Sequence, residues 1–225
     1  MRLRNMGLGL VTAAMLAAPS AAQPAGEADI DRSYFASDLS LSNLLDDPAG
    51  AAGMVRAAGT LADCLVRAGG NSAGGLIGGP GTNDAEYARL MRGVTVTYAQ
   101  CKTPRARGLH PYFVNGALAE RLLLSQNRDW VPRAANVNAA QAQSFYQPQR
   151  GQSGMENVGR CAAVFSPGFV IQVLMTEAGS DAEEDALDAL YAATPECGLR
   201  ERPEAIPEIY QRSALAVGLW LWSNR

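Results

Sequence analysis

Apolar residues recur at intervals of three and four along most of this chain of 225 residues, a spacing that gathers them on one face of an α-helix. The spacing is clearest in residues 83–101 and 180–197, and each of these stretches ends close to a cysteine. Ser180 and Glu183 fit a capping box, in which two side chains bond the backbone N–H groups at a helix start. These patterns predict an all-α fold.

Further segments carry the same helical pattern. A short amphipathic helix is expected over residues 38–47, where Asp46, Asp47 and Pro48 end it. A longer helix begins near Met54, and two more follow over residues 111–124 and 207–222. Ser166 is expected to be the N-cap of another helix, with proline at its first position.

Residues 94–97 alternate between valine and threonine and, taken alone, are typical of a strand. The matching segment later in the chain, residues 190–193, has a helical pattern. We therefore expect residues 94–97 to be helical and to carry the pattern on to Cys101, with Cys101 and Cys197 on buried helical faces.

The second half of the chain repeats the first in outline. Residues of the same type recur about 97 positions apart, as in the pairs Cys64 and Cys161, Asp84 and Asp181, and Leu118 and Leu215, with Cys101 and Cys197 one position out of step. The repeat predicts two similar helical units packed into one compact domain. The expected divisions are a signal peptide at 1–22, an N-terminal segment with a short helix at 23–53, unit 1 at 54–126, a glutamine-rich linker at 127–154, and unit 2 at 155–225.

The first 22 residues have the form of an export signal: an early arginine pair, an apolar run and small residues ending at Ala22. The apolar run is shorter than the roughly 20 residues that span a bilayer, so no stable membrane anchor is expected. Export would place the mature chain in the periplasm or outside the cell. In these oxidising compartments four cysteines form disulfides, and the repeat favours Cys64–Cys101 and Cys161–Cys197 among the three possible pairings.

Charge and composition narrow the choice of partner. The formal net charge of −3 and the absence of a basic cluster argue against nucleic acid. His110 is the only histidine and no cysteine pair has the spacing of a zinc site, so we expect neither a metal nor another cofactor. Residues 127–154 combine glutamine with Trp130, Phe145 and Tyr146. They are interpreted as a linker with a short helix near residues 134–145, the alternative being a partner-binding segment with aromatic anchors.

One motif is a candidate for catalysis. Residues 70–74 match the glycine–serine–glycine pattern of a hydrolase nucleophile elbow, with Ser72 as the nucleophile. Asp84 or Glu86 and then His110 follow in the order that such enzymes use. Residues 64–68 would have to be the strand before the elbow, yet residues 23–63 supply no sheet, and unit 2 replaces the motif with an ordinary turn. A serine hydrolase is therefore the alternative rather than the main hypothesis.

The order of cysteine, aspartate-containing helix start, second cysteine and alanine-rich helix resembles a group of exported alphaproteobacterial proteins with no established function. The resemblance covers about residues 54–125 and 155–222 and carries no active-site residue. Together these observations predict a non-enzymatic exported protein that binds an unidentified protein or peptide. A carrier of a small apolar ligand, held between the two units, is a second alternative.

Overall fold

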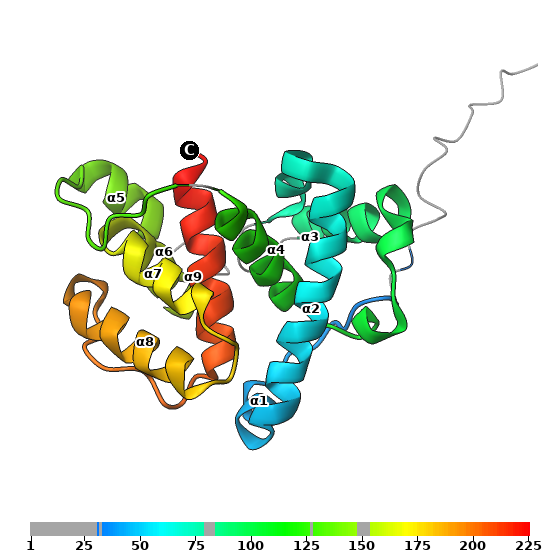
Figure 1. Ribbon diagram of the computed structural model, residues 1–225, viewed down its shortest axis with the longest axis horizontal. Coiled ribbons are helices and arrows are strands. Elements are labelled where there is room, and N and C mark those ends of the chain that lie inside the picture. Colours follow the sequence, from blue (N-terminus) through cyan, green and yellow to red (C-terminus); the bar gives the residue numbers. More distant parts are fainter. Residues whose placement is uncertain (1–30, 32, 79–83, 127, 148–153) are drawn as a thin grey trace, which may run out of the picture.

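The computed structural model describes residues 31, 33–78, 84–126, 128–147 and 154–225. Every regular element in these residues is helical, so the all-α prediction is confirmed. Figure 1 shows α4 (Pro111–Ser125) and α9 (Glu208–Ser223) in the middle of the molecule. α2 (Pro48–Gly69) packs against α4, while α6 (Gly154–Phe165) packs against α9. The predicted signal peptide lies outside the described residues.

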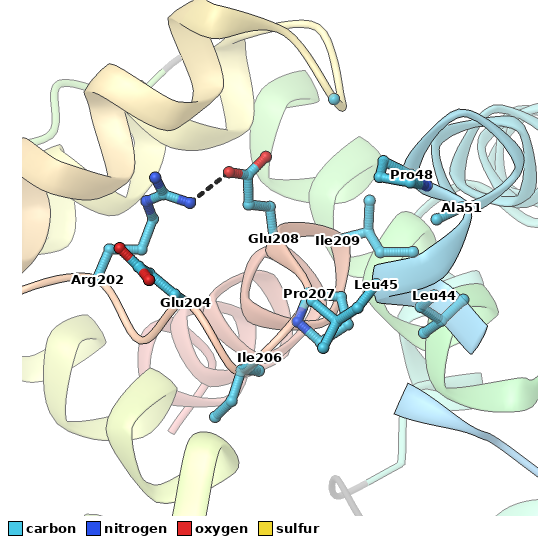
Figure 2. Close-up of a pocket in the computed structure, with 11 residues that line it drawn as sticks. Leu44, Leu45, Pro48, Ala51, Arg202, Glu204, Ile206, Pro207, Glu208 and Ile209 are labelled. Carbon is cyan, nitrogen blue, oxygen red and sulfur yellow. Dashed lines mark hydrogen bonds and ion pairs between the residues drawn. The ribbon is translucent and has the colours of Figure 1, made fainter. Parts of the chain in front are cut away.

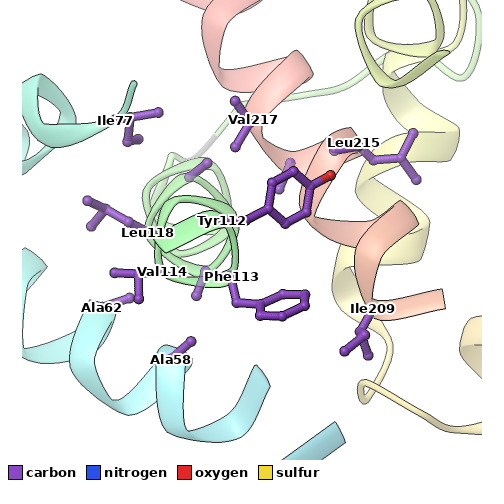
Figure 3. Close-up of a cluster of buried hydrophobic side chains, with 14 of the residues drawn as sticks. Ala58, Ala62, Ile77, Tyr112, Phe113, Val114, Leu118, Ile209, Leu215 and Val217 are labelled. Carbon is purple, nitrogen blue, oxygen red and sulfur yellow. The ribbon is translucent and has the colours of Figure 1, made fainter. Parts of the chain in front are cut away.

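The core forms around α4, which is apolar on nearly all sides and therefore buried on nearly all sides. Figure 3 shows α4 between α2 and α9, with Ala58 and Ala62 on one side and Ile209, Leu215 and Val217 on the other. The rings of Tyr112 and Tyr210 stack between the two central helices, with centroids 4.2 Å apart and planes 8° apart. The Tyr112 hydroxyl donates to the Tyr210 carbonyl oxygen at 3.0 Å.

Asp47 lies between the first two helices and bonds the backbone of both. Its backbone N–H donates to the Asn43 carbonyl oxygen and closes α1 (Leu41–Asp46). Its carboxylate accepts from the Gly50 N–H at 2.9 Å and caps α2. α2 therefore begins at Pro48, and the expected start near Met54 was wrong because Asp47 both ends one helix and begins the next.

The helix that leads to Cys101 is broken, which corrects the expectation of one continuous helix. α3 (Asp84–Arg92) gives way to a π-helix, η2 (Gly93–Thr97), and then to the 3-10 helix η3 (Ala99–Cys101). The Thr95 hydroxyl donates to the Met91 carbonyl oxygen at 2.8 Å, a bond that competes with regular helix geometry. Cys101 is nevertheless buried, as predicted, and residues 94–97 are helical rather than a strand.

The matching helix of unit 2 is shorter than expected. α8 (Asp181–Ala193) starts at Ser180, whose hydroxyl accepts from the Glu183 N–H at 3.2 Å. It ends before Pro195, which lacks the N–H that helix continuation needs. Cys197 therefore lies on a separate 3-10 helix, η5 (Pro195–Cys197), and is half-buried rather than on a buried helical face.

Two disulfides join Cys64 to Cys101 and Cys161 to Cys197, so both predicted pairings are confirmed. Their sequence separations are 37 and 36 residues, and both Cα–Cα distances are 5.5 Å. Each bridge ties a long helix to a short 3-10 helix. Both are compatible with an oxidising location outside the cytoplasm.

α7 (Pro167–Met175) follows α6 after a sharp bend at Ser166. Pro167 is its first residue, as expected, but the Ser166 side chain does not cap it. The Thr194 hydroxyl, after α8, instead donates to the Ser166 hydroxyl at 2.7 Å, and both residues are buried. This serine therefore joins two helices rather than capping one.

The described part of the linker contains one helix, α5 (Ala139–Tyr146), close to the predicted residues 134–145. Its buried face packs on unit 2 through Ala142 and Phe145, and the Phe145 ring centroid lies 5.1 Å from that of Trp222. Phe145 is therefore an internal contact and is not available as a partner anchor.

Candidate functional site

Ser72 lies on the 3-10 helix η1 (Gly70–Leu76), which directly follows α2. Its hydroxyl donates to the Gly69 carbonyl oxygen at 2.5 Å and lies 3.5 Å from the Tyr98 hydroxyl. Residues 64–68, the strand that a nucleophile elbow would need, are part of α2. The elbow interpretation of residues 70–74 was therefore wrong, because the serine follows a helix in an all-helical surrounding.

The glycines around Ser72 have structural roles. A β-carbon on Gly74 would lie 2.5 Å from the Trp220 ring of α9, closer than carbon atoms can approach. Glycine at this position therefore lets the end of α9 rest on η1. Gly70, the other glycine of the pattern, has a positive φ of 53°, which favours glycine at the end of α2, so the two glycines have separate structural reasons.

His110 is the N-cap of α4, where its Nδ1 accepts from the Tyr112 N–H at 3.2 Å. Burial lowers the pKa of this imidazole, and the negative charge of Asp38 offsets part of the effect. No hydrogen bond joins His110 to Ser72, while Asp84 is the first residue of α3. The structure thus gives Ser72 and His110 separate local partners.

A buried ion cluster joins the two halves. Arg212 of α9 pairs with Glu120 of α4 at 2.8 Å and with Glu183 of α8 at 2.8 Å. Its guanidinium also donates to the carbonyl oxygens of Val173, Leu174 and Thr176 at the end of α7. Burial by itself lowers the pKa of Arg212, but the bonds to both glutamates outweigh burial and raise it. The cluster fixes α4, α7, α8 and α9 around one charged side chain.

Glu183 connects the ion cluster to the turn between α7 and α8. One carboxylate oxygen pairs with Arg212, and the other accepts from the Gly179 N–H at 2.6 Å. Gly179 belongs to the turn between α7 and α8, and this turn lies against the N-terminal part of α2. Glu183 is fully buried and holds this turn in place.

Beside this turn lies a pocket of about 170 Å³, drawn in Figure 2. One wall comes from α1 and the start of α2, and the other comes from the segment before α9 together with the first turn of that helix. The apolar lining residues are Leu44, Leu45, Pro48, Ala51, Ile206, Pro207 and Ile209. The charged ones are Arg202, Glu204 and Glu208.

Arg202 organises the charged wall. Its guanidinium pairs with Glu208 at 2.6 Å, with Asp188 at 3.1 Å, and with Glu184. Burial raises the pKa of Glu208, against the opposite effect of Arg202. Figure 2 shows the Arg202–Glu208 pair on one side of the pocket and Leu44, Leu45 and Pro48 on the other. The pocket therefore presents an apolar wall to a charged wall.

A second pocket of about 430 Å³ shares Pro48 and Gly179 with the first. Small side chains and Arg56, Glu177 and Ser180 complete its lining. The two pockets adjoin each other between the start of α2 and unit 2 and are here together called the junction groove. The sequence did not predict the residues that form the groove, because they come from three segments far apart in the chain, within residues 44–56, 177–180 and 202–209.

A third pocket, of about 180 Å³, lies at the other end of α9 and is lined by Trp130, Pro167 and Trp222 among others. The Arg128 guanidinium lies over the Trp130 ring, 4.6 Å from its centroid. Trp130 is partly buried against the main core. Of the three aromatic residues predicted as possible anchors, it is the one that lines a surface pocket.

The described residues contain neither a metal-binding cluster nor a single helix that could span a membrane. None of the acidic, histidine or cysteine side chains there forms a group of three or more that could hold a metal ion. No single described helix has both the length and the apolar composition to cross a membrane, although α6 and α7, joined at an angle of 113°, pass that test as a bent pair.

Comparisons of the chain with protein-family models, with curated proteins and with solved structures returned no match.

Proposed function

We propose that this chain is an exported, non-enzymatic binding protein that holds a peptide or a segment of another protein in the junction groove. The observation that carries the proposal is the groove's pair of unlike walls, one of leucine, proline and alanine and one organised by Arg202. Such walls match a polypeptide, which presents apolar and polar groups at short intervals along its length.

The small volume of the first pocket and the lining of the second favour a polypeptide over a small apolar ligand. Pockets for small molecules measure about 300–1,000 Å³ and are lined mainly by large apolar and aromatic side chains. The pocket beside Leu44 measures about 170 Å³. The adjoining pocket of about 430 Å³ is lined mostly by alanine, glycine and charged residues and contains no aromatic side chain. Two small adjoining pockets of this kind fit an extended polypeptide better than a compact apolar ligand.

The proposal includes export and internal duplication. Export by way of residues 1–22 to the periplasm or the medium is supported by the two disulfides. Duplication is supported by the same order of helix, bridge and central helix in both halves. In each half, a disulfide joins the helix that carries the first cysteine to a 3-10 helix. The next long helix in the chain then packs against the helix that carries the first cysteine. The groove then lies between unit 2 and the N-terminal segment with the start of α2.

A peptide selection tests the proposed function. The mature chain, residues 23–225, is used to select from a displayed library of random 12-residue peptides, and bound peptides are mapped by NMR. We expect peptides that shift the resonances of Leu44, Leu45 and Ile206. Leu45→Glu should abolish their binding, because this half-exposed leucine lines the groove.

The matched control is Val96→Glu, which changes an equally exposed apolar residue that does not line the groove. This variant should bind the selected peptides as the unchanged chain does. A failure to select any peptide, or peptides that map away from the groove, would contradict the proposed function. Tight binding of an apolar dye in the groove without peptide binding would instead support the carrier.

A further inference from the structure

The junction groove has an excess of negative charge. Arg202 is surrounded by the carboxylates of Glu184, Asp188 and Glu208, so one positive charge meets three negative ones. Glu204 in the first pocket and Glu177 in the second add two carboxylates, and among the described residues neither forms an ion pair. Arg56 is the only other basic residue that lines the groove. In the lining of the groove, three carboxylates (Glu177, Glu204 and Glu208) thus face two guanidinium groups, and Glu184 and Asp188 pair with Arg202 from outside the lining.

The excess charge lies next to apolar surface. Glu204 and Glu208 flank Ile206 in the chain, and all three line the same pocket as Leu44 and Leu45. In a bound peptide, the residue whose side chain packs on the leucines therefore has neighbours, one or two positions away in the peptide, that lie beside the carboxylates. Figure 2 shows Glu204 and Glu208 on the side of the pocket opposite Leu44.

A cation in the partner would relieve an existing electrostatic cost. Arg202 already donates to three separate carboxylates, one from each nitrogen, but its single positive charge cannot balance all three. Each carboxylate, however, can accept several hydrogen bonds. A second basic side chain would therefore gain charge-assisted bonds without breaking those of Arg202.

We propose that the groove binds a partner segment in which an apolar side chain, packed against Leu44, Leu45 and Ile206, is accompanied by a lysine or arginine that reaches Glu204 and Glu208. This inference rests on the proposed function and adds the chemical class of the partner. Charge complementarity of this kind sets specificity and the rate of association more than it adds affinity. The partner is thus an apolar and basic polypeptide segment, not an acidic one.

The peptide selection described above supplies the first measurement. We expect the selected 12-residue peptides to be enriched in a lysine or arginine within a few residues of a leucine, isoleucine or phenylalanine. Their affinity should fall about tenfold between low and physiological salt, because the charge pairs lie at a partly exposed rim.

A charge reversal supplies the second measurement. Glu204→Lys should weaken binding of a selected peptide about tenfold, since it places a like charge opposite the basic residue. The matched control is Glu201→Lys, which makes the same change of charge at an exposed residue of the same segment outside the groove. That variant should change the affinity less than about twofold. Both positions are exposed, so both variants should retain the unfolding temperature of the unchanged chain.

The outcomes separate the two proposals. Peptides that bind in the groove but show no basic enrichment, or bind equally well to the Glu204→Lys variant, overturn this inference and leave the proposed function standing. Acidic peptides that bind more tightly to the Glu204→Lys variant also overturn it. Selection of no groove-binding peptide overturns both.

Discussion

Gly116 of α4 and Ser213 of α9 meet where the two central helices cross. A β-carbon on Gly116 would lie 2.6 Å from both the Cβ and the Oγ of Ser213. The two residues are also 97 positions apart, which is the spacing of Cys64 and Cys161. The central helices therefore approach each other closely at two residues that have this same spacing.

Gly116→Ala should destabilise the protein by about 1–3 kcal/mol, because the added methyl group forces the two central helices apart. Urea unfolding followed by circular dichroism measures the change. Gly75→Ala is the control, since a β-carbon there meets no atom within 4 Å, and it should change the free energy of unfolding by less than about 0.5 kcal/mol. Equal losses for the two variants would show that the helix crossing is not tightly packed.

Arg212→Met should lower the free energy of unfolding by about 3–5 kcal/mol, because it leaves Glu120 and Glu183 buried without their cation. It also removes the donors that bond the last carbonyl oxygens of α7. Arg133→Met is the matched control: Arg133 pairs with Glu196 at 2.5 Å, but its side chain is 40% exposed. We expect that change to cost less than about 1 kcal/mol. A small loss for the Arg212 variant would contradict the cluster's structural role.

Replacing Cys161 and Cys197 together by alanine should cost about 4 kcal/mol, from the greater freedom of the unfolded chain. The same replacement of Cys64 and Cys101 should cost nearly the same, since the two sequence separations are 36 and 37 residues. Thermal unfolding of both double variants measures the losses. Peptide mapping under non-reducing conditions checks the pairing, and free thiols or crossed bridges would contradict it.

Stability should fall as the pH drops below 6.5, the ordinary pKa of histidine, because burial lowers the pKa of His110 in the folded chain. In this range the unfolded chain binds a proton that the folded chain does not bind, so lowering the pH favours unfolding. The loss continues until the pH passes the lowered pKa. Protonation would also prevent Nδ1 from accepting the Tyr112 N–H and would break the cap.

His110→Asn should flatten this pH dependence, since asparagine also caps helices but does not titrate. Urea midpoints of both proteins between pH 5 and 8 provide the comparison. His110 is the only histidine, so no other imidazole contributes. Glu208, whose pKa burial raises, acts in the opposite direction: its contribution is present at low pH and is lost as the pH rises through its raised pKa. Parallel pH profiles for the two proteins would contradict the role of His110.

Capping residues, prolines and apolar spacing in the sequence predicted those helices whose ends depend on neighbouring residues. The side chain of Ser180 starts α8, and a proline precedes or begins α4, α7 and α9. Apolar periodicity predicted the burial of Leu90 and Leu190, and repeated cysteine positions predicted both bridges. The breaks at Gly93 and before Pro195 were missed, because the pattern of apolar residues continues through both.

The candidate site was much less predictable. Arg212 is a charged residue in a mostly apolar helix, which signals a buried partner but does not identify it. Glu120 lies 92 positions earlier in the sequence, so only the packing of α4 on α9 brings the two together. The junction groove likewise needs Leu44 and Ile206 to meet across the fold.

The sequence by itself determined the helical class, the disulfide pairs and the approximate bounds of most helices, because these follow from periodicity, capping and repetition along the chain. Only the tertiary structure decided that the Ser72 hydroxyl bonds the end of α2, that His110 caps α4, that Glu183 is buried, and that apolar and acidic residues meet in a groove. Those outcomes depend on which distant segments pack together, and the free energy of that packing is shared among many contacts that no short motif records.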